Sequence, residues 1–355
     1  MDSISNIRRW LVETSKISGH SIPSILFDFI RLKRKEKIAK EEYSNFRLYS
    51  DNRYFRETFL PFAQAQIYWK LLNPDAYAPL ARDKYIAHCL FSQAGIPTSE
   101  LYLYYNPQLA ASNSSQAYNI EGVIEILKQK SVKQCVIKLA QDSAHGDGVI
   151  VCHDIKIDGN KCLLKRYDNS HVDLKDVLKD QPLLFESLIV QNKQFASFNN
   201  SSVNTIRMMT ALYPDNTVKL FAAFLKIGRD GSDVDNAGGG GNVDCAIDIT
   251  TGELHNVVEF NSWNDVRKIT HHPDSNTLLE GVRIEGWNEI VKIVNDYQAR
   301  LPQLKAIGWD IAVTDNGPIV IEINNWWDTT GQLFLGKGWK KEVVECYNAW
   351  KKCKL

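Results

Sequence analysis

The first 75 residues carry apolar side chains at helical spacing, and this pattern predicts a helical region at the start of the chain. Within it, residues 21–43 read SIPSILFDFIRLKRKEKIAKEEY, an apolar stretch followed by a basic one. The basic run at 31–40 is more typical of a solvated helix face than of a contact with a membrane or a polyanion. Two further helices are expected at 82–95, which ends at Gly95, and at 121–130.

Further along the chain, short β-branched runs separated by turn residues predict strands. The strands are expected at 135–140, 148–155, 161–167, 183–190, 205–213, 217–227 and 242–249. Three more helices are expected at 171–180, 286–301 and 339–353. Strand-rich segments with interposed helices predict an α+β or mixed α/β architecture.

Residues 308–328, GWDIAVTDNGPIVIEINNWWD, read as a β-hairpin that carries three polar side chains in an apolar frame. Because side chains alternate along a strand, Glu322 and Asn324 share one face. A three-residue turn with Gly317 in the left-handed conformation would add Asp310 to that face, whereas a two-residue turn would direct Asp310 to the other one. In the first register, three oxygen ligands suited to Mg²⁺ converge. Otherwise the hairpin simply exposes a polar face to solvent.

Length and charge narrow the possible classes of protein. With 355 residues, the chain has room for two domains or for one large α/β unit with an appendage. Lysine plus arginine and aspartate plus glutamate both number 42, so no net charge favours nucleic-acid binding. The seven cysteines include no CxxC pair, which favours reduced thiols over disulfides or a zinc site. The sequence has no apolar stretch of membrane-spanning length and no signal-peptide core, so we expect a cytoplasmic protein.

Two stretches in the first half of the chain combine charge with glycine or with an apolar strand. CVIKLAQDSAHGDGVIV places Lys138 inside a strand and Gly146 and Gly148 in the loop that follows. Glycines let backbone N–H groups approach phosphate oxygens, and a strand lysine supplies positive charge, although a plain hairpin with a snorkelling lysine fits as well. FESLIV offers Glu186 before an apolar run that either faces a purine edge or forms a plain strand.

The second half of the chain contains two similar candidates. SVNTIRMMT places Arg207 in mid-strand, where a phosphate or a carboxylate must compensate its charge. FLKIGRDGSDVDNAGGGGNVDC contains Lys226, Arg229, Asn236 and four consecutive glycines. Ordering four glycines costs backbone entropy, so a mobile lid or a close approach to a ligand accounts for them better than a surface turn does.

Taken in order, these stretches resemble the ATP-grasp superfamily over roughly residues 80–335. The most specific element is Asp310 followed by Glu322-Ile323-Asn324. The succession VNTIR, KIGRDGS, DNAGGGG and GWDIAVTDNGPIVIEIN looks most like the branch called sugar-transfer-associated ATP-grasp. Members of that branch are predicted to act in cell-surface polysaccharide biosynthesis, and the helical N-terminus also suits it.

The resemblance implies an α+β fold in which two α+β subdomains clamp ATP, preceded by a helical N-terminal region at 1–78. The ATP-grasp domain would span residues 79–355. Its N-terminal subdomain, 79–182, would carry Lys138 and the first glycine loop. Its C-terminal subdomain, 183–355, would carry the lid and the metal site.

The resemblance also implies which residues bind the nucleotide. They are Lys84, Lys138, His145, Gly146, Gly148, Glu186, Ser187, Leu188, Ile189, Asn204, Asn236, Gly239 and Gly240. Lys84 and Lys138 would contact phosphates under the loop around Gly146. Glu186 and the backbone of 187–189 would hold the adenine, and Asn204 or the adjacent threonine would lie near the ribose.

The remaining implied roles concern metal ions and charge. Asp310, Glu322 and Asn324 would hold two Mg²⁺ ions, or Mn²⁺ in their place, with Glu322 bridging. Lys226 and Arg207 would neutralise charge on the transferring γ-phosphate, and Arg229 is a third candidate catalytic cation.

The sequence departs from the superfamily pattern at two places. Many relatives carry an arginine two residues before the metal aspartate, where this chain has Gly308, and Arg207 is a candidate replacement. Many relatives also have a small-residue turn after the metal asparagine, where this chain has Trp326 and Trp327. The two tryptophans either stack on a sugar or plug the end of the domain.

The function that the resemblance implies is an ATP-dependent carboxylate ligase acting through an acyl phosphate. The partners would be a small-molecule carboxylate and an amine or hydroxyl acceptor, such as an amino sugar or another saccharide. Two alternatives stay open: an ATP-dependent phosphotransferase, and a nucleotide-binding protein without turnover.

Overall fold

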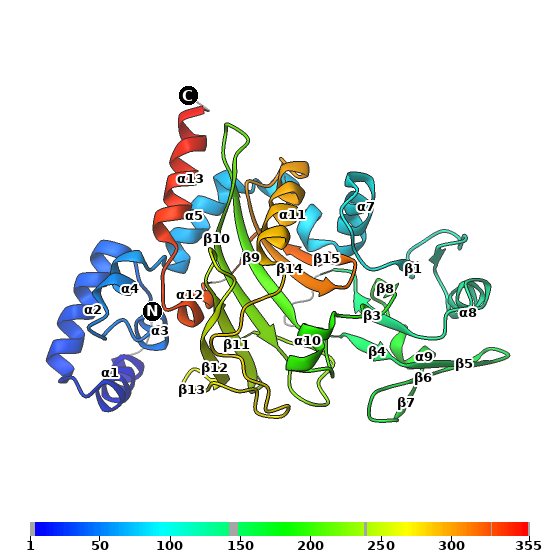
Figure 1. Cartoon of the computed structure of the whole chain (residues 1–355), viewed down its shortest axis with the longest axis horizontal. Coiled ribbons are helices and arrows are strands. Elements are labelled where there is room, and N and C mark those ends of the chain that lie inside the picture. The colour runs from blue at the N-terminus through cyan, green and yellow to red at the C-terminus, as the bar shows by residue number, and fades with distance from the viewer. Residues whose placement is uncertain (1–3, 142–147, 238–239, 328, 354–355) are drawn as a thin grey trace.

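The computed structural model describes residues 4–141, 148–237, 240–327 and 329–353. These residues form a group of helices, a large central sheet and two smaller sheets, arranged in that order across the molecule (Figure 1). The α+β class and the helical N-terminal region are confirmed. Within the described ranges, no helix combines the length and apolar character needed to cross a bilayer.

Four helices form the N-terminal region at the left of Figure 1. They are α1 (Ile4–Ser18), α2 (Ile22–Glu36), α3 (Lys40–Asn45) and α4 (Arg53–Thr58). Helix α2 begins after Ser21, whose hydroxyl oxygen accepts a hydrogen bond from the backbone N–H of Ser24. Apolar residues of the four helices pack into a core of their own, centred on Phe29, Tyr43 and Leu48.

The central sheet has seven strands in the order β13-β12-β11-β10-β9-β14-β15. Their bounds are β9 (Thr205–Leu212), β10 (Val218–Ile227), β11 (Asn242–Ile247), β12 (Leu254–Ser262), β13 (Asp265–Lys268), β14 (Ala306–Thr314) and β15 (Gly317–Asn324). One face packs on α7 (Lys84–Ala94), α10 (Lys193–Phe198) and α11 (Trp287–Arg300). The other face packs on α5 (Phe62–Leu72), α12 (Gly331–Leu335) and α13 (Lys340–Cys353).

The first of the smaller sheets has five strands in the order β2-β1-β8-β3-β4. Their bounds are β1 (Leu101–Tyr105), β2 (Gln116–Ala117), β3 (Cys135–Leu139), β4 (Ile150–Cys152) and β8 (Leu183–Glu186). Helix α8 (Ile120–Gln129) contributes to the core of this sheet. Strand β8 pairs with both β1 and β3, so the segment 183–186 is part of the five-stranded sheet. The division of the chain at residue 183 stays a prediction.

The second small sheet has three strands, β5 (Asp154–Asp158), β6 (Lys161–Lys165) and β7 (His171–Asp173). The expected helix at 171–180 is wrong over its first part, because 171–173 pair with β6 and only α9 (Leu174–Val177) is helical. Asp173 caps α9 by accepting a hydrogen bond from the N–H of Lys175. Before α7 lie a 3-10 turn (Asp75–Tyr77) and α6 (Pro79–Arg82).

The β14–β15 hairpin reaches the expected alignment by an unexpected route. Thr314 pairs with Gly317, so the turn has two residues, and of the two alternatives the three-residue turn is wrong. That register alone would turn Asp310 away from Glu322, but a bulge between Asp310 and Ile311 shifts the pairing by one residue. Asp310 therefore pairs directly with Glu322, as the metal hypothesis requires.

Candidate active site

One face of the central sheet changes from apolar to polar along its strands. On β9, Met209 belongs to the core beneath α5 and α13, whereas Arg207 points from the same face two residues earlier. On β10, Phe224 and Lys226 are related in the same way. Strand alternation thus places charged side chains side by side beyond the edge of an apolar core.

Asp310 on β14 is the centre of this polar group. Its side chain is 3% exposed, and it accepts hydrogen bonds from Arg207 at 2.7 Å (Nε to Oδ1) and 2.9 Å (Nη2 to Oδ2). The ammonium of Lys226 lies 3.0 Å from Oδ1. Burial alone would raise the pKa of Asp310, but the attraction of Arg207 and Lys226 outweighs burial and holds that pKa below its ordinary value.

The surroundings of Glu322 raise its pKa, whereas those of Asp310 lower the pKa of that residue. Burial raises its pKa first, and the neighbouring Asp310 carboxylate raises it further, while Lys84 opposes both effects. The Lys84 ammonium is 3.9 Å from Glu322 Oε2. The pKa values of these two adjacent carboxylates are thus shifted in opposite directions. A bound cation would offset the repulsion between them.

The residues of the hairpin fit a magnesium ion. Asp310 and Glu322 offer carboxylate oxygens, and Asn324 lies beside them with its amide nitrogen 3.4 Å from Asp310 Oδ2. Among the described residues, no three histidine, cysteine, aspartate or glutamate side chains converge as a metal site. Two carboxylates and an amide are nevertheless the ligand supply typical of Mg²⁺, which completes its shell with waters and phosphate oxygens.

The side chain of Arg207 on β9 lies close to Gly308 on the neighbouring strand β14. A Cβ added to Gly308 would lie 3.6 Å from Arg207 Cδ and 3.6 Å from Asn324 Cβ. Asp310 and Arg207 are also cross-strand partners on β14 and β9. Arg207 thus lies beside both Gly308 and Asp310, and its role as a replacement for the expected arginine stays a prediction.

Asp235 extends the polar group from the loop that follows β10, and the sequence analysis missed it. Its Oδ2 accepts hydrogen bonds from the backbone N–H of Thr205 at 2.8 Å and from the Thr205 hydroxyl at 2.5 Å. Its Oδ1 is 3.9 Å from the ammonium of Lys226. Asp235 is one of three aspartates in this polar loop, with Asp230 and Asp233, so nothing in the sequence singled it out.

A second charged pair lies on the five-stranded sheet. Lys138 on β3 contacts Glu186 at the end of β8, with 2.9 Å between Nζ and Oε2, and Ser99 donates to the same oxygen at 2.8 Å. Burial disfavours the charged carboxylate, but Lys138 and Ser99 outweigh it and lower the pKa of Glu186.

A pocket joins the two charged groups. Lys84 at the start of α7, Glu186 of β8 and Glu322 of β15 all line it. His88 of α7 lines it as well, and its Nε2 lies 3.1 Å from the carbonyl oxygen of Ser99. The start of α7 is tied to the end of β3, because the Lys84 N–H donates to the Ala140 carbonyl at 2.8 Å. Residues of α7, of the five-stranded sheet and of the central sheet thus line one pocket.

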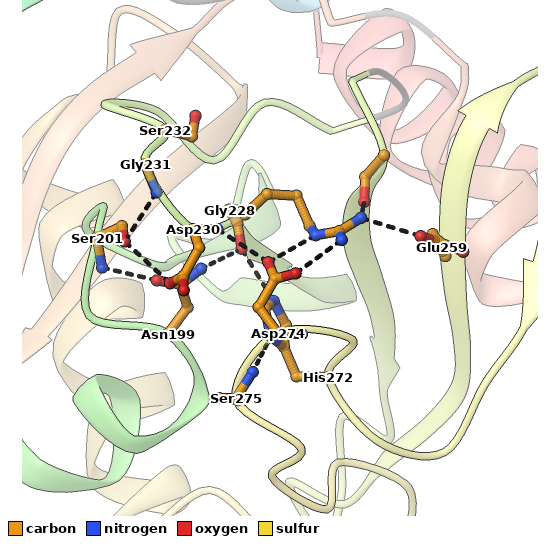
Figure 2. Close-up of polar contacts among 12 residues, drawn as sticks. Asn199, Ser201, Gly228, Asp230, Gly231, Ser232, Glu259, His272, Asp274 and Ser275 are labelled. Atoms are coloured by element: carbon orange, nitrogen blue, oxygen red, sulfur yellow. Dashed lines mark hydrogen bonds and ion pairs between the residues drawn. The ribbon is translucent and has the colours of Figure 1, made fainter. Parts of the chain in front are cut away.

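Arg229 is placed differently from the expectation. Its guanidinium donates to Asp274 at 2.7 and 2.8 Å, to Glu259 at 2.9 Å and to the Gly241 carbonyl at 3.0 Å. Figure 2 shows this network at the base of the glycine-rich loop, where His272 also approaches the Gly228 carbonyl. The structure thus gives Arg229 a role in joining the two ends of the loop. A catalytic role for Arg229 stays a prediction.

The glycine-rich loop also contacts the segment that follows β6 of the three-stranded sheet. Asp233 lies 3.0 Å from the guanidinium of Arg166, which follows β6. In the same loop, Gly240 has φ +66°, and an added Cβ would meet nothing within 4 Å. The Asn236 carbonyl accepts a hydrogen bond from Asn242 at 2.9 Å. The described part of the loop is therefore held at its base and linked to the segment after β6.

Other predicted nucleotide contacts have mixed outcomes. The Asn204 amide is fully buried and donates to the carbonyls of Phe195 and Asn199, so it holds a loop in place and is not positioned to reach a ribose. The Ser187 N–H donates to the Glu100 carbonyl at 2.8 Å, so this N–H is already hydrogen-bonded within the protein. Leu188 and Ile189 follow as half-buried residues. His145, Gly146 and Gly239 lie outside the described residues, and Gly148 lies just beyond the first gap.

The two tryptophans after the hairpin differ in burial. Trp327 is 2% exposed and packs on Trp69 of α5 with ring centroids 4.2 Å apart, so it plugs the core. Trp326 is half-buried, and the guanidinium of Arg82 lies 5.8 Å from its ring centroid.

The geometry can now be compared with known proteins. A sequence model of the family described as sugar-transfer associated ATP-grasp matches residues 63–346. The chain belongs to this family. The ATP-grasp match begins at α5, so the helices α1–α4 precede it. No curated protein matches the sequence.

Solved structures with a similar fold include three synthetases and ligases. Phosphoribosylamine–glycine ligase from Thermotoga maritima is 13% identical with a TM-score of 0.45, over 82% of this chain and 61% of that one. VanG D-Ala:D-Ser ligase from Enterococcus faecalis is 10% identical with a TM-score of 0.44, over 76% and 62%. N5-carboxyaminoimidazole ribonucleotide synthetase from Thermotoga maritima is 12% identical with a TM-score of 0.42, over 80% and 55%. The chain spans about half the length of the first structures it matches.

Proposed function

We propose that this chain binds MgATP between its two subdomains and activates a small-molecule carboxylate as an acyl phosphate, which an amine or hydroxyl then captures. The observation that carries the proposal is the Asp310–Glu322 pair on β14 and β15, surrounded by Arg207, Lys226 and Lys84. Membership of the sugar-transfer associated family supports an acceptor that is an amino sugar or another saccharide in cell-surface polysaccharide biosynthesis.

The nucleotide would lie between Lys138 and Glu186 on one side and the β14–β15 hairpin on the other. Lys138 and Lys84 would supply positive charge to phosphate oxygens, and the ion pairs that they form with Glu186 and Glu322 would loosen as phosphate competes for the ammonium groups. The Glu186 carboxylate would then be available to accept a hydrogen bond from the adenine amino group.

Asp310, Glu322 and Asn324 would hold Mg²⁺, which would neutralise negative charge on the phosphates. Arg207 and Lys226 compensate the charge of Asp310 in this structure. Lys226 would turn from Asp310 toward the γ-phosphate, because Asp310 would then be a metal ligand and would no longer need the ammonium to compensate its charge. Arg207, held by two hydrogen bonds and cross-strand pairing, would remain on Asp310 and fix its orientation.

The proposed reaction conserves atoms in two steps. A carboxylate oxygen attacks the γ-phosphorus, a new P–O bond forms, and the bond to the ADP oxygen breaks. The acceptor then attacks the acyl carbon, the phosphate leaves with the original carboxylate oxygen, and the acceptor loses a proton to solvent. The loop of Asp233 and Gly240 would shield the acyl phosphate from water, and its ion pair with Arg166 supports this because it links the loop to the segment after β6.

The proposal can be tested by ATP consumption. The purified chain is incubated with MgATP, an amino acid or a sugar acid, and an amino sugar or a nucleotide sugar. We expect ADP and free phosphate to form only when both a carboxylate and an acceptor are present, and Glu322→Gln to abolish this. ATP consumption that is the same in Glu322→Gln as in the wild type would overturn the site assignment.

Two alternative functions give different products. A phosphotransferase would leave the phosphate on its acceptor and would release none. A nucleotide-binding protein without turnover would bind MgATP but form no ADP with any pair of substrates. The sequence retains Lys138, Asp310, Glu322 and Asn324, which favours turnover, because a site without turnover would be expected to have lost at least one of them.

A further inference from the structure

Helix α2 presents an apolar face that the rest of the described chain leaves exposed. Its inward side consists of Ile25, Phe29 and Leu32. On a neighbouring side, Ile22, Leu26 and Ile30 are 39%, 38% and 39% exposed. They follow one another at a spacing of four residues, so they form one continuous row along the helix.

Two more apolar side chains enlarge this row. Phe27, next to Leu26 on the same helix, is 75% exposed. Ile17, near the end of α1, is 62% exposed and precedes the short connection to α2. Single exposed apolar residues are ordinary, but five on two adjoining helices form a patch that indicates an interaction surface. Figure 1 shows α1 and α2 at the outer edge of the molecule, away from the three sheets.

Basic side chains continue the exposed face toward the end of α2. Arg34 extends the row of Ile22, Leu26 and Ile30 by one more turn, and Lys33 is exposed beside it. Lys37, in the left-handed position that ends the helix, is also exposed. The apolar part of the face thus ends in a cationic cluster.

The acidic residues of α2 do not offset this cluster, because they face the body of the protein. Asp28 accepts hydrogen bonds from Arg56 at 2.6 and 2.8 Å and from Tyr43 at 3.0 Å. Glu36 is paired with Lys340 and accepts a hydrogen bond from Gln64 at 3.2 Å. The charge presented outward by α2 is therefore positive.

We propose that the outer face of α1 and α2, made up of Ile17, Ile22, Leu26, Phe27 and Ile30 with Lys33, Arg34 and Lys37, docks onto an anionic lipid surface. An amphipathic helix with apolar side chains and adjoining basic ones lies in the interface plane, where the apolar groups enter the acyl boundary and the cations meet headgroups. The surface lies on helices that precede the ATP-grasp match, so this docking is independent of the proposed reaction.

The charge pattern favours lipid over a second copy of the chain. In a two-fold interface through α2, an antiparallel arrangement would set each basic turn against apolar turns of the partner. A parallel arrangement would set the two basic turns against each other. Neither arrangement gives Lys33 and Arg34 a partner of opposite charge, whereas phospholipid headgroups do.

Vesicle co-sedimentation of the full chain tests the proposal. We expect binding to vesicles rich in phosphatidylglycerol, weak binding to vesicles of phosphatidylcholine alone, and release as salt is raised. Phe27→Ser should lower the partition coefficient by about tenfold or more, because it removes one large apolar side chain from the lipid. Lys33→Glu/Arg34→Glu should abolish the preference for anionic vesicles.

Matched variants elsewhere on the surface serve as controls. Leu278→Ser removes an apolar side chain that is 48% exposed in the ATP-grasp part of the chain, and Lys179→Glu reverses an exposed charge there. Both should bind vesicles like the wild type, and all four variants should keep the wild-type melting temperature. No binding to anionic vesicles, or equal loss in the controls, would overturn the proposal. So would a wild-type dimer that Phe27→Ser converts to a monomer, because a second copy would then cover this face.

Discussion

Asp310 of β14 lies directly opposite Glu322 of β15, although the turn between the two strands has the length that should separate them. The bulge beside Asp310 shifts the pairing of the two strands by one residue and so brings Asp310 opposite Glu322. It also explains why Ile321 and Glu322 are both half-buried, while Val320 and Ile323 point into the core. The hairpin therefore holds two carboxylates on one face at an electrostatic cost.

The first prediction concerns the electrostatic repulsion between the carboxylates of Asp310 and Glu322. Glu322→Gln should remove the repulsion from Asp310 and make the metal-free protein more stable at neutral pH, while ATP turnover falls to background. Since burial and Asp310 raise the pKa of Glu322 in the folded state, its charged form opposes folding above that pKa. The gain in stability should therefore shrink as the pH falls through the raised pKa toward the ordinary value of 4.5.

Urea unfolding of the wild type and Glu322→Gln across this pH range, without Mg²⁺, measures the effect. Saturating MgATP should reverse the order at neutral pH, because only the wild type gains from binding the ion. A Glu322→Gln protein less stable than the wild type in the absence of metal would contradict the electrostatic account.

The second prediction concerns the two hydrogen bonds that the Arg207 guanidinium donates to Asp310. Arg207→Lys keeps one positive charge but cannot make both hydrogen bonds to Asp310. We expect ATP turnover to fall by about a hundredfold. Arg207→Ala should in addition destabilise the fold by ~3 kcal/mol, because it breaks a buried pair. As a control, Arg283→Ala breaks an exposed pair with Glu253 and should cost less than ~1 kcal/mol.

The third prediction concerns the Lys138–Glu186 pair. Lys138→Met should leave the Glu186 carboxylate buried without its cation, which destabilises the protein by ~3 kcal/mol at neutral pH and weakens ATP binding. Because the pKa of Glu186 is lowered in the wild type, the pair stabilises the fold above pH 4.5 and this contribution is lost as the pH falls through the lowered pKa.

A double variant separates folding from binding at this pair. Lys138→Met/Glu186→Gln removes both charges, so its stability should recover toward that of the wild type, while its affinity for ATP stays low. Recovery of ATP affinity in the double variant, measured by calorimetry, would show that the pair does not contact the nucleotide.

The fourth prediction concerns the glycine-rich loop. Gly240 and Gly231 both have positive φ, +66° and +76°, and neither would meet an atom within 4 Å if it carried a Cβ. Alanine at either position should therefore cost a similar ~1 kcal/mol of stability from backbone strain. We expect Gly240→Ala to reduce ATP turnover much more than Gly231→Ala does. The reason is that, in the proposed lid, the backbone of the glycine run must come close to phosphate. Equal turnover in the two variants would make the loop a linker.

The hairpin motif and the long periodic segments were predictable from the sequence, because alternation and helical spacing act locally. Helices α7, α8, α11 and α13, and strands β9, β10 and β11, lie within two residues or so of their expected bounds. The strand β12 was missed because LHNVVEFNS mixes polar and apolar residues without strict alternation. Its stability comes from pairing with β11 and β13, which no local pattern records.

The charges of the site were identifiable, but their partners were not. Arg229 looked like Lys226, three residues earlier, yet strand alternation and the end of β10 send Arg229 to Asp274 and Glu259. Asp235 and His88 reach the site only through tertiary contacts. Spacing along the chain cannot distinguish these outcomes, because they depend on which segments fold back on one another.

The central claim, that a carboxylate is activated by phosphorylation, is tested most directly by following the carboxylate oxygen. A carboxylate substrate labelled with ¹⁸O is incubated with the protein, MgATP and the acceptor, and the released phosphate is examined by mass spectrometry. We predict labelled inorganic phosphate in amounts equal to the amide or ester product, and a hydroxamate when hydroxylamine replaces the acceptor. A stable phosphorylated product, with no label in free phosphate and no hydroxamate, would contradict the claim and make the protein a kinase.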